Sequence, residues 1–238
     1  MSISPEIQPQ SLIVPQQAES AKHLTNLRET NAVIYPESHE DDMGETTIHY
    51  DFISDLFNSL RLFFAQRAEV LIAANLNLYY EEGFPQNYYT PDLMICFGVE
   101  NRPRNVFKLW EEKQFPQVIF EVTSERTWRN DISEKHEFYE EFKVEEYYLI
   151  DTEDYLPLPL IAYRREDDRL KRLRLETDRA LSPRLGLEIV HAGTEIKLFD
   201  PNKQEYLPTL AEASAKADTA QSEIARLKAE LARLKGEN

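Results

Sequence analysis

Residues 117–151 read QVIFEVTSERTWRNDISEKHEFYEEFKVEEYYLID, and this stretch decides the fold. Residues 116–124 are rich in β-branched and aromatic side chains and predict a buried strand. Residues 130–143 predict a helix that begins at Asn130 or Asp131, and residues 144–151 predict a second strand. A strand, a helix and a strand in this order are typical of a right-handed crossover in a helix-covered sheet.

More elements are predicted on both sides of this unit. Residues 46–67 predict a helix, because apolar side chains recur there at helical spacing. Residues 69–81 and 91–99 predict two strands, and the chain after Asp151 predicts shorter strands that we expect to form hairpins extending the same sheet. The fold class is therefore α/β, a mixed α+β sheet with flanking helices, and the domain spans residues 46–207.

The N-terminal segment and the overall composition indicate where the chain is disordered, which cysteine-based sites are excluded and which cellular compartment is expected. Residues 1–45 contain four prolines and an acidic cluster, which predict a partly disordered extension. The single cysteine, Cys96, excludes an internal disulfide framework and a cysteine-based zinc site. No stretch is apolar enough to cross a membrane, and the N-terminus lacks the features of a signal peptide, so we expect a cytoplasmic protein.

Residues 208–238 predict a helix with an unbroken heptad repeat. Apolar residues follow one another at alternating spacings of three and four: Leu210, Ala213, Ala217, Ala220, Ile224, Leu227, Leu231 and Leu234. This pattern predicts a homo-oligomer formed through residues 210–234 as a coiled coil. A single helix packed on its own domain is the alternative that the sequence leaves open.

Two carboxylates interrupt the most strand-like segments, Asp92 in TPDLMICF and Glu121 in QVIFEVTS. A buried unpaired charge is unfavourable, so each of these acids should be paired with a positive group or bind a metal. If the two strands are neighbours, the carboxylates converge, and a cation between them resolves their repulsion. Oxygen ligands of this kind suit Mg²⁺ or Mn²⁺, and the backbone carbonyl of Val122 could complete the protein's share of a metal site.

A lysine supplies the positive group that such a site lacks. Asp131, Lys135 and Tyr139 follow one another at intervals of four, so they share one face of the predicted helix. If that face covers the strand of Glu121, the ammonium group of Lys135 can reach the same point. Asp131 could instead serve only the helix N-terminus, and Tyr139 could serve only packing.

These residues resemble the motifs of a large bacterial family of restriction-endonuclease-like proteins, a branch of the PD-(D/E)xK nuclease superfamily. The resemblance extends from about His49 to about Leu210. It is carried by a Pro-Asp pair, a Glu-Val-x-Ser motif, an Asp-x-x-x-Lys-x-x-x-Tyr motif and a tyrosine-rich strand that ends in aspartate, here Pro91, Asp92, Glu121, Val122, Ser124, Asp131, Lys135, Tyr139, Tyr147, Tyr148 and Asp151.

The resemblance implies a metal-dependent endonuclease with Asp92, Glu121 and Lys135 as catalytic residues. Asp92, Glu121 and Val122 would hold the metal, and His49 matches a histidine of the family's first helix. The chain departs from the superfamily at Thr123, where a lysine is usual, and the family places that lysine in the following helix as Lys135. It departs from the family at Lys143, where glycine commonly ends the helix.

The net charge of −16 works against non-specific binding of nucleic acid. The segment from Asn101 to Lys135 is an exception, with seven basic residues against six acidic ones. Four arginines of this segment follow the site strands and are the candidate DNA contacts: Arg102, Arg104, Arg126 and Arg129.

Three functions remain open from the sequence. The first is a Mg²⁺-dependent endonuclease that acts on DNA. The second is a non-catalytic scaffold that retains the nuclease fold, binds a protein or nucleic-acid partner and assembles through its C-terminal helix. The third is action on another phosphate substrate, because two carboxylates and a metal do not identify the leaving group.

Overall fold

The computed structural model describes residues 33–37, 47–192 and 195–236. The predicted N-terminal extension over residues 1–45 lies outside this part of the chain, except for residues 33–37. The elements, in chain order, are α1 (Thr47–Phe63), β1 (Val70–Ala74), β2 (Leu78–Tyr79), β3 (Tyr88–Tyr89), β4 (Leu93–Phe97), β5 (Phe107–Lys108), α2 (Leu109–Glu112), β6 (Val118–Thr123), α3 (Trp128–Asp131), α4 (Glu134–Glu141), β7 (Glu146–Asp151), β8 (Leu160–Glu166), β9 (Arg169–Arg172), β10 (Arg179–Ser182), β11 (Leu187–Ala192), β12 (Glu195–Asp200), β13 (Glu205–Tyr206) and α5 (Leu210–Gly236).

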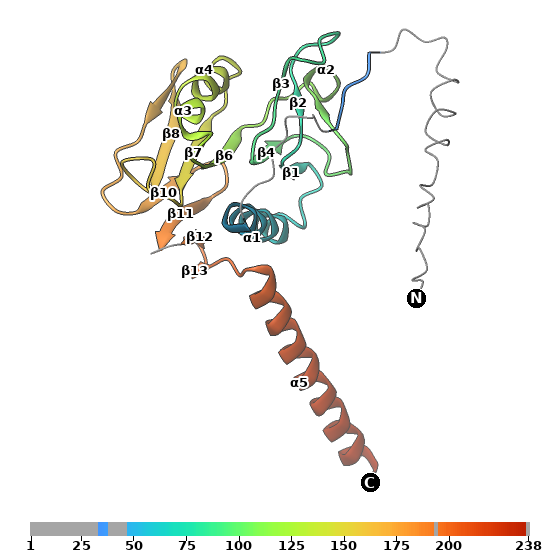
Figure 1. The fold of residues 1–238 in the computed structure, drawn as a ribbon. Coiled ribbons are helices and arrows are strands. Elements are labelled where there is room, and N and C mark those ends of the chain that lie inside the picture. Colours follow the sequence, from blue (N-terminus) through green and yellow to red (C-terminus); the bar gives the residue numbers. More distant parts are fainter. Residues whose placement is uncertain (1–32, 38–46, 193–194, 237–238) are drawn as a thin grey trace, which may run out of the picture. The chain divides into compact units, whose positions relative to one another are not determined.

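A central six-stranded sheet has the strand order β1-β4-β6-β7-β8-β9 (Figure 1). β6 and β7 pair in parallel, and the other neighbours in this sheet pair antiparallel. The connection from β6 to β7 passes through α3 and α4, because two parallel neighbours need a crossover. The mixed α/β fold and the strand–helix–strand unit predicted from residues 117–151 are therefore confirmed.

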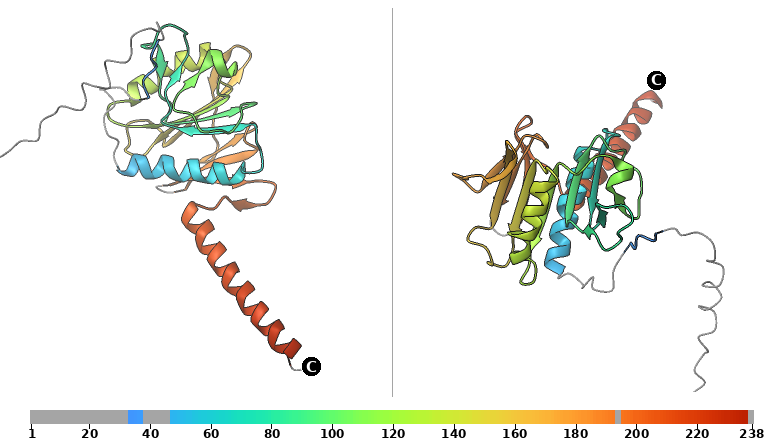
Figure 2. Two further views of the ribbon diagram at one scale, coloured as in Figure 1. Left: turned by 90° about the vertical axis from the view of Figure 1, so that its right-hand side faces the viewer. Right: turned by 90° about the horizontal axis from the view of Figure 1, so that it is seen from above.

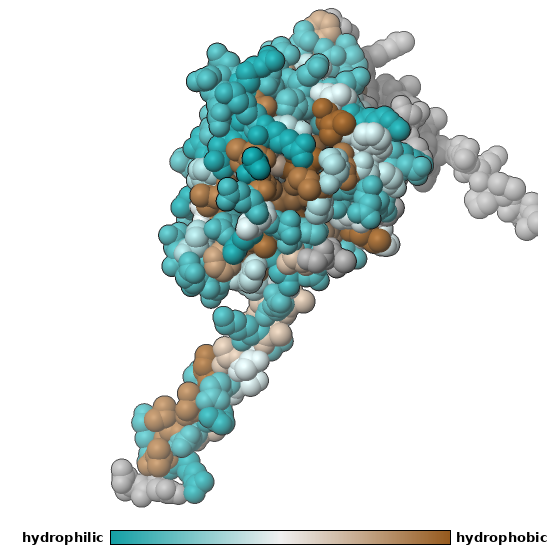
Figure 3. Space-filling view, turned by 90° about the vertical axis from the view of Figure 1, so that its left-hand side faces the viewer, coloured by the Kyte–Doolittle hydropathy of each residue, from teal (hydrophilic) through white to brown (hydrophobic). Residues whose placement is uncertain are grey.

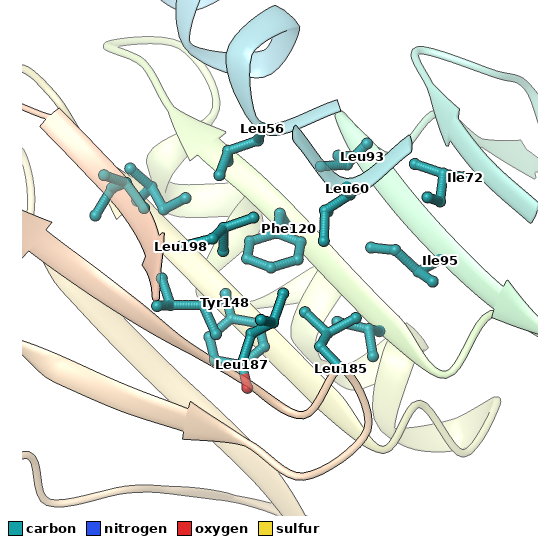
Figure 4. Packing of buried hydrophobic residues seen from close by; sticks show 14 of the residues in the cluster. Leu56, Leu60, Ile72, Leu93, Ile95, Phe120, Tyr148, Leu185, Leu187 and Leu198 are labelled. Carbon is teal, nitrogen blue, oxygen red and sulfur yellow. The ribbon is translucent and has the colours of Figure 1, made fainter. Parts of the chain in front are cut away.

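The two faces of the central sheet have different covers, as Figures 1 and 2 show. On one face, α1 and a second sheet of order β10-β11-β12-β13 enclose a core that includes Leu60, Phe120 and Leu187 (Figure 4). On the other face, Ile119 and Tyr147 pack with residues of α4. Successive residues of a strand point to opposite faces, so Phe120 enters the first core while Ile119 and Glu121 face α4.

The structure corrects three details of the predicted elements. The strand expected over residues 69–81 is split into β1 and β2 at Asn75, which adopts a positive φ of 50°. The helix expected over residues 130–143 begins earlier, at Trp128, and is interrupted between α3 and α4. The hairpins expected after Asp151 divide, because β8 and β9 extend the central sheet whereas β10 to β13 form a sheet of their own.

The C-terminal helix predicted from the heptad repeat is present as α5, and none of its 27 residues is buried. The helix begins with a capping box in which Thr209 Oγ1 accepts the Glu212 N–H at 3.2 Å and a Glu212 side-chain oxygen accepts the Thr209 N–H at 2.9 Å. Among the helices that the structure describes, none is long and apolar enough to cross a membrane.

Candidate active site

Asp92 and Glu121 meet where β4 and β6 lie side by side. The antiparallel register pairs Leu93 with Phe120, so the next step places Asp92, just before β4, opposite Glu121. The Asp92 N–H lies 3.4 Å from Glu121 Oε2, and the Val122 N–H donates to Asp92 Oδ2 at 2.7 Å. The two acids therefore form one group, on the sheet face that α3 and α4 cover.

Glu121 is fully buried, with 0% of its surface exposed. Its Oε1 accepts the Tyr139 hydroxyl at 2.6 Å, and its Oε2 accepts the Lys135 ammonium at 2.9 Å. Burial raises the pKa of Glu121 above its usual range, and the positive charge of Lys135 opposes that rise. The buried carboxylate is thus compensated by a cation and a hydroxyl from α4.

Lys135 lies between two carboxylates. Its Nζ is 2.9 Å from Glu121 Oε2 and 2.9 Å from Asp131 Oδ1, and 12% of its side chain is exposed. Burial alone would lower the pKa of Lys135, but Glu121 and Asp131 outweigh this effect and hold the pKa above its usual range. The structure therefore brings Lys135 onto Glu121 and Asp131 onto Lys135, although the helix is split between these two motif residues.

Tyr147 and Ser124 fix the segment that carries Asp131. The Tyr147 hydroxyl donates to the Asp131 carbonyl at 2.9 Å, which ties the end of α3 to β7. The Thr127 N–H lies 3.3 Å from Ser124 Oγ, and the two hydroxyls are 3.1 Å apart, in the turn between β6 and α3. Ser124 of the Glu-Val-x-Ser motif thus shapes this turn, whereas Asp151 binds the Glu153 and Leu156 N–H groups and closes the loop after β7.

His49 brings α1 to the same group. Its Nε2 lies 3.4 Å from Asp92 Oδ2, and the residue is 9% exposed. Asp92 therefore contacts α1 through His49 and β6 through the Val122 backbone. All the residues expected to support the site, Asp131, Tyr139 and His49, lie in contact with one of its three central side chains.

The oxygen donors present fit a hard divalent cation. Two carboxylates from neighbouring strands, with the Val122 backbone beside them, are ligands that Mg²⁺ and Mn²⁺ accept together with water. In the part of the chain that the structure describes, no three His, Cys, Asp or Glu side chains gather as a metal-binding group.

The four candidate arginines separate into two pairs. β4 and β6 run antiparallel, so the chain after β4 leaves at the opposite end of the sheet from Asp92. Arg102 and Arg104 lie in that segment, and both bind Glu112, at 3.1 and 2.9 Å. The Arg104 side chain is only 5% exposed. These two candidate DNA contacts therefore lie away from Asp92 and pair with Glu112.

Arg126 and Arg129 follow β6 at the end that carries Glu121, and both are exposed. Sequence reasoning missed the residue between them, Trp128, which is half-buried and has the Arg129 guanidinium 4.3 Å from its ring centroid. The signal was an aromatic residue between two arginines directly after a site strand. This arrangement presents a cation and a flat ring next to the acidic group.

The chain is similar in sequence and fold to known proteins. Residues 40–192 match the model of the Uma2 family, which is described as "Putative restriction endonuclease". A solved structure from Anabaena variabilis, titled as a putative nuclease belonging to DUF820, shares 11% sequence identity with a TM-score of 0.45. The similarity covers 60% of this chain and 76% of that chain. No curated protein matches the chain. Since the family match spans more than half of the chain and contains Asp92, Glu121 and Lys135, this protein belongs to the Uma2 family of restriction-endonuclease-like proteins.

Proposed function

We propose that the protein is a metal-dependent endonuclease that hydrolyses DNA phosphodiester bonds. One observation carries this proposal: the Lys135 ammonium contacts Glu121 at 2.9 Å, on the side of the sheet where Asp92 meets the same carboxylate. These two acids and the amine come from three separate parts of the chain, and the fold alone does not require them to lie together. Membership of the Uma2 family of restriction-endonuclease-like proteins supports the same function.

Asp92, Glu121 and the Val122 carbonyl would hold Mg²⁺ or Mn²⁺. When bound there, such an ion neutralises charge on the phosphate and lowers the pKa of a water molecule that can attack phosphorus. Asp92 is positioned for this by the Val122 N–H and by His49. Tyr139 holds one oxygen of Glu121 through its hydroxyl, which orients the other toward Asp92 and Lys135.

Lys135 would act as a fixed positive charge. Its raised pKa keeps the side chain protonated, so it is suited to stabilising the negative charge that develops on the phosphate. The role of general base fits less well, because a base must give up that proton near neutral pH. Asp131 holds the ammonium from the other side at 2.9 Å and acts as a positioning residue.

Arg126, Trp128 and Arg129 would guide the substrate. The arginines are exposed beside the end of β6, where they can pair with phosphates of a DNA strand passing the acids. The Trp128 ring can stack on a base that has left its pair. A strongly acidic protein needs such a local basic region to bind DNA at all.

A non-catalytic scaffold is the second candidate function. It is favoured by one specific observation: Lys135 already compensates Glu121 and Asp131, so the group is electrostatically satisfied as an ion-pair network without a metal. In that case the three side chains would serve only the fold, and substitution would lower stability without removing an activity.

Cleavage of supercoiled plasmid with Mg²⁺ or Mn²⁺ separates the two functions. We expect metal-dependent nicking by the natural sequence and a loss of at least a hundredfold in Asp92→Asn and Lys135→Ala. Glu137→Gln is the matched control, since Glu137 is an exposed acid on the same helix, and it should cleave normally. Cleavage retained by both site variants would reject Asp92 and Lys135 as catalytic residues. Cleavage absent from every form would reject the endonuclease and favour the scaffold.

A further inference from the structure

Helix α5 lies outside the segment that the family match covers, which ends at residue 192. Its large apolar side chains are about half exposed: Leu210, Ile224, Leu227, Leu231 and Leu234. Figure 3 shows apolar groups gathered along the C-terminal part of this helix. A continuous row of exposed aliphatic side chains marks a surface that is covered when the protein is assembled.

The spacing of this row fits a helix partner. Leu210, Ala217, Ile224 and Leu231 share one core position of the heptad, and Ala213, Ala220, Leu227 and Leu234 share the other. The row therefore keeps to one narrow seam over four heptads. Among the described residues of α5 none is buried, and Ala213 at its start is the one seam residue that is half-buried. Its own domain therefore covers the start of the seam at most and leaves the rest exposed.

The charges beside the seam select the partner and its direction. Glu223 and Glu230 occupy one flanking position, and Lys228 and Lys235 occupy the other. In a parallel pair of identical helices, each of these glutamates faces a lysine of the other copy. In a fully overlapping antiparallel pair, Glu223 faces Glu223 of the other copy and Glu230 faces Lys216, while Lys228 faces Ser214. The parallel pair therefore forms more attractive contacts beside the seam. Glu223 now pairs with Arg226 on its own helix at 2.7 Å, an exposed contact that is readily exchanged.

We propose that α5 pairs in parallel with α5 of a second copy of this chain, as a two-stranded coiled coil. The self-complementary seam and the flanking charges carry this proposal. The alanine-rich first half of the seam contributes less, so Ile224, Leu227, Leu231 and Leu234 supply most of the association.

A parallel pair determines where the two copies of the domain lie on the dimer. The capping box at Thr209 begins α5 only three residues after β13 ends at Tyr206. Both copies of the domain are therefore attached at the same end of the coiled coil. On the proposed function, one particle would hold two cleavage sites; the pairing itself does not depend on that function.

The mass of the full-length chain in solution is the first test. Sedimentation velocity should give twice the single-chain mass of 27.9 kDa. Replacing Leu227 and Leu234 by alanine keeps helix propensity and should weaken the dimer at least tenfold. The matched control replaces Ala225 and Ala232, which lie outside the seam, by leucine, and its dimer should be unchanged. A monomer of the natural sequence at tens of micromolar, or an unchanged dimer in the variant that carries Leu227→Ala and Leu234→Ala, would overturn the pairing.

Charge exchange tests that the partner is a second copy. One variant carries Glu223→Lys with Glu230→Lys, and the other carries Lys228→Glu with Lys235→Glu. Each alone should dissociate, because like charges then flank the seam on both sides. Mixing the two should restore the double mass as a heterodimer, and a mixture that stays monomeric would contradict the proposal.

A single engineered cysteine tests the direction. Leu234→Cys should form an intermolecular disulfide under mild oxidation, because equivalent core positions meet in a parallel pair. In an antiparallel pair these cysteines lie about 36 Å apart, the length of 24 helical residues. The natural Cys96 is buried and does not interfere. A dimer that fails to cross-link would overturn the parallel arrangement.

Cleavage assays on the same seam variants separate this proposal from the proposed function. If no form cleaves DNA while the dimer behaves as described, the endonuclease is rejected and the coiled coil stands. If the natural sequence cleaves as a monomer, the coiled coil is rejected and the site stands.

Discussion

Glu121 is fully buried, and its hydrogen bonds explain how the fold accommodates a buried carboxylate. Tyr139 and Lys135 each take one of its oxygens, at 2.6 and 2.9 Å. A hydrogen bond to a buried charged group contributes about 1.5–3 kcal/mol. The stability of the site therefore depends on Tyr139, which would not contact a substrate, as well as on Lys135.

Removing the Tyr139 hydroxyl tests this dependence. Tyr139→Phe should lower the free energy of unfolding by about 2 kcal/mol, because one oxygen of a buried carboxylate loses its donor. Urea denaturation followed by circular dichroism measures the change. Tyr206→Phe, at an exposed tyrosine, is the control and should change stability by less than about 0.5 kcal/mol.

The thiol of Cys96 gives a second prediction at this scale. Burial raises its pKa to about 12, so at pH 8 only about one molecule in ten thousand carries the reactive thiolate. We expect no reaction with a thiol reagent in the native protein at pH 8, and full reaction after unfolding. Rapid labelling of the native protein would show that the strand β4 opens readily.

Two residues after helix α4, the chain turns at Lys143, a residue that does not suit its backbone conformation. Lys143 adopts φ of +61°, the left-handed region that glycine occupies without strain. The departure from the family's glycine at this position, noted from the sequence, thus has a conformational meaning. The same residue donates its N–H to the Glu140 carbonyl at 3.2 Å, so the turn itself is intact.

Relief of this strain should stabilise the protein. Lys143→Gly is expected to raise the free energy of unfolding by about 0.5–1 kcal/mol, seen as a higher midpoint in urea. Glu137→Gly, at an exposed position inside α4, should do the opposite by about 1 kcal/mol. A loss of stability in Lys143→Gly would show that the lysine side chain is needed there.

The elements predicted best were those with strong local patterns. The β6–helix–β7 unit and α5 follow from uninterrupted apolar periodicity, and the site residues follow from their order along the chain. The break at Asn75 was missed because a positive φ at an asparagine leaves the alternation of VLIAANLNLYY unchanged. The separation of β10–β13 was missed because pairing between distant strands depends on tertiary contacts that short amphipathic segments do not reveal. Arg102 and Arg104 lie away from the acids for a different reason. They follow β4, whereas Asp92 precedes it, so they lie at opposite ends of this strand.

At the scale of the whole molecule, Glu146 connects the two sheets. This buried residue of β7 accepts the Tyr148 hydroxyl at 2.9 Å and the Arg184 N–H at 2.9 Å, and it also binds the Ser182 hydroxyl of β10. One carboxylate thus satisfies three donors from both sheets. The second sheet covers the face of the central sheet opposite to the one that carries the acids. The contacts of Glu146 therefore stabilise the sheet on which the site is built.

Loss of this carboxylate should loosen that connection. Glu146→Ala is expected to lower the free energy of unfolding by about 3 kcal/mol, because buried donors are left unpaired. Ser182→Ala removes one of them and should cost about 1 kcal/mol. Chemical denaturation measures both, and equal small effects in the two variants would show that the carboxylate is not the link.

The central claim is that Asp92 and Glu121 form one binding site for a divalent cation, with Lys135 beside it. Calorimetric titration with Mn²⁺, without DNA, tests it most directly. We predict one ion per chain in the natural protein, with at least tenfold weaker binding in Asp92→Asn and in Glu121→Gln. Lys135→Met should bind Mn²⁺ at least as tightly, because a competing cation has left Glu121. Binding that is unchanged in both acid variants would contradict the account.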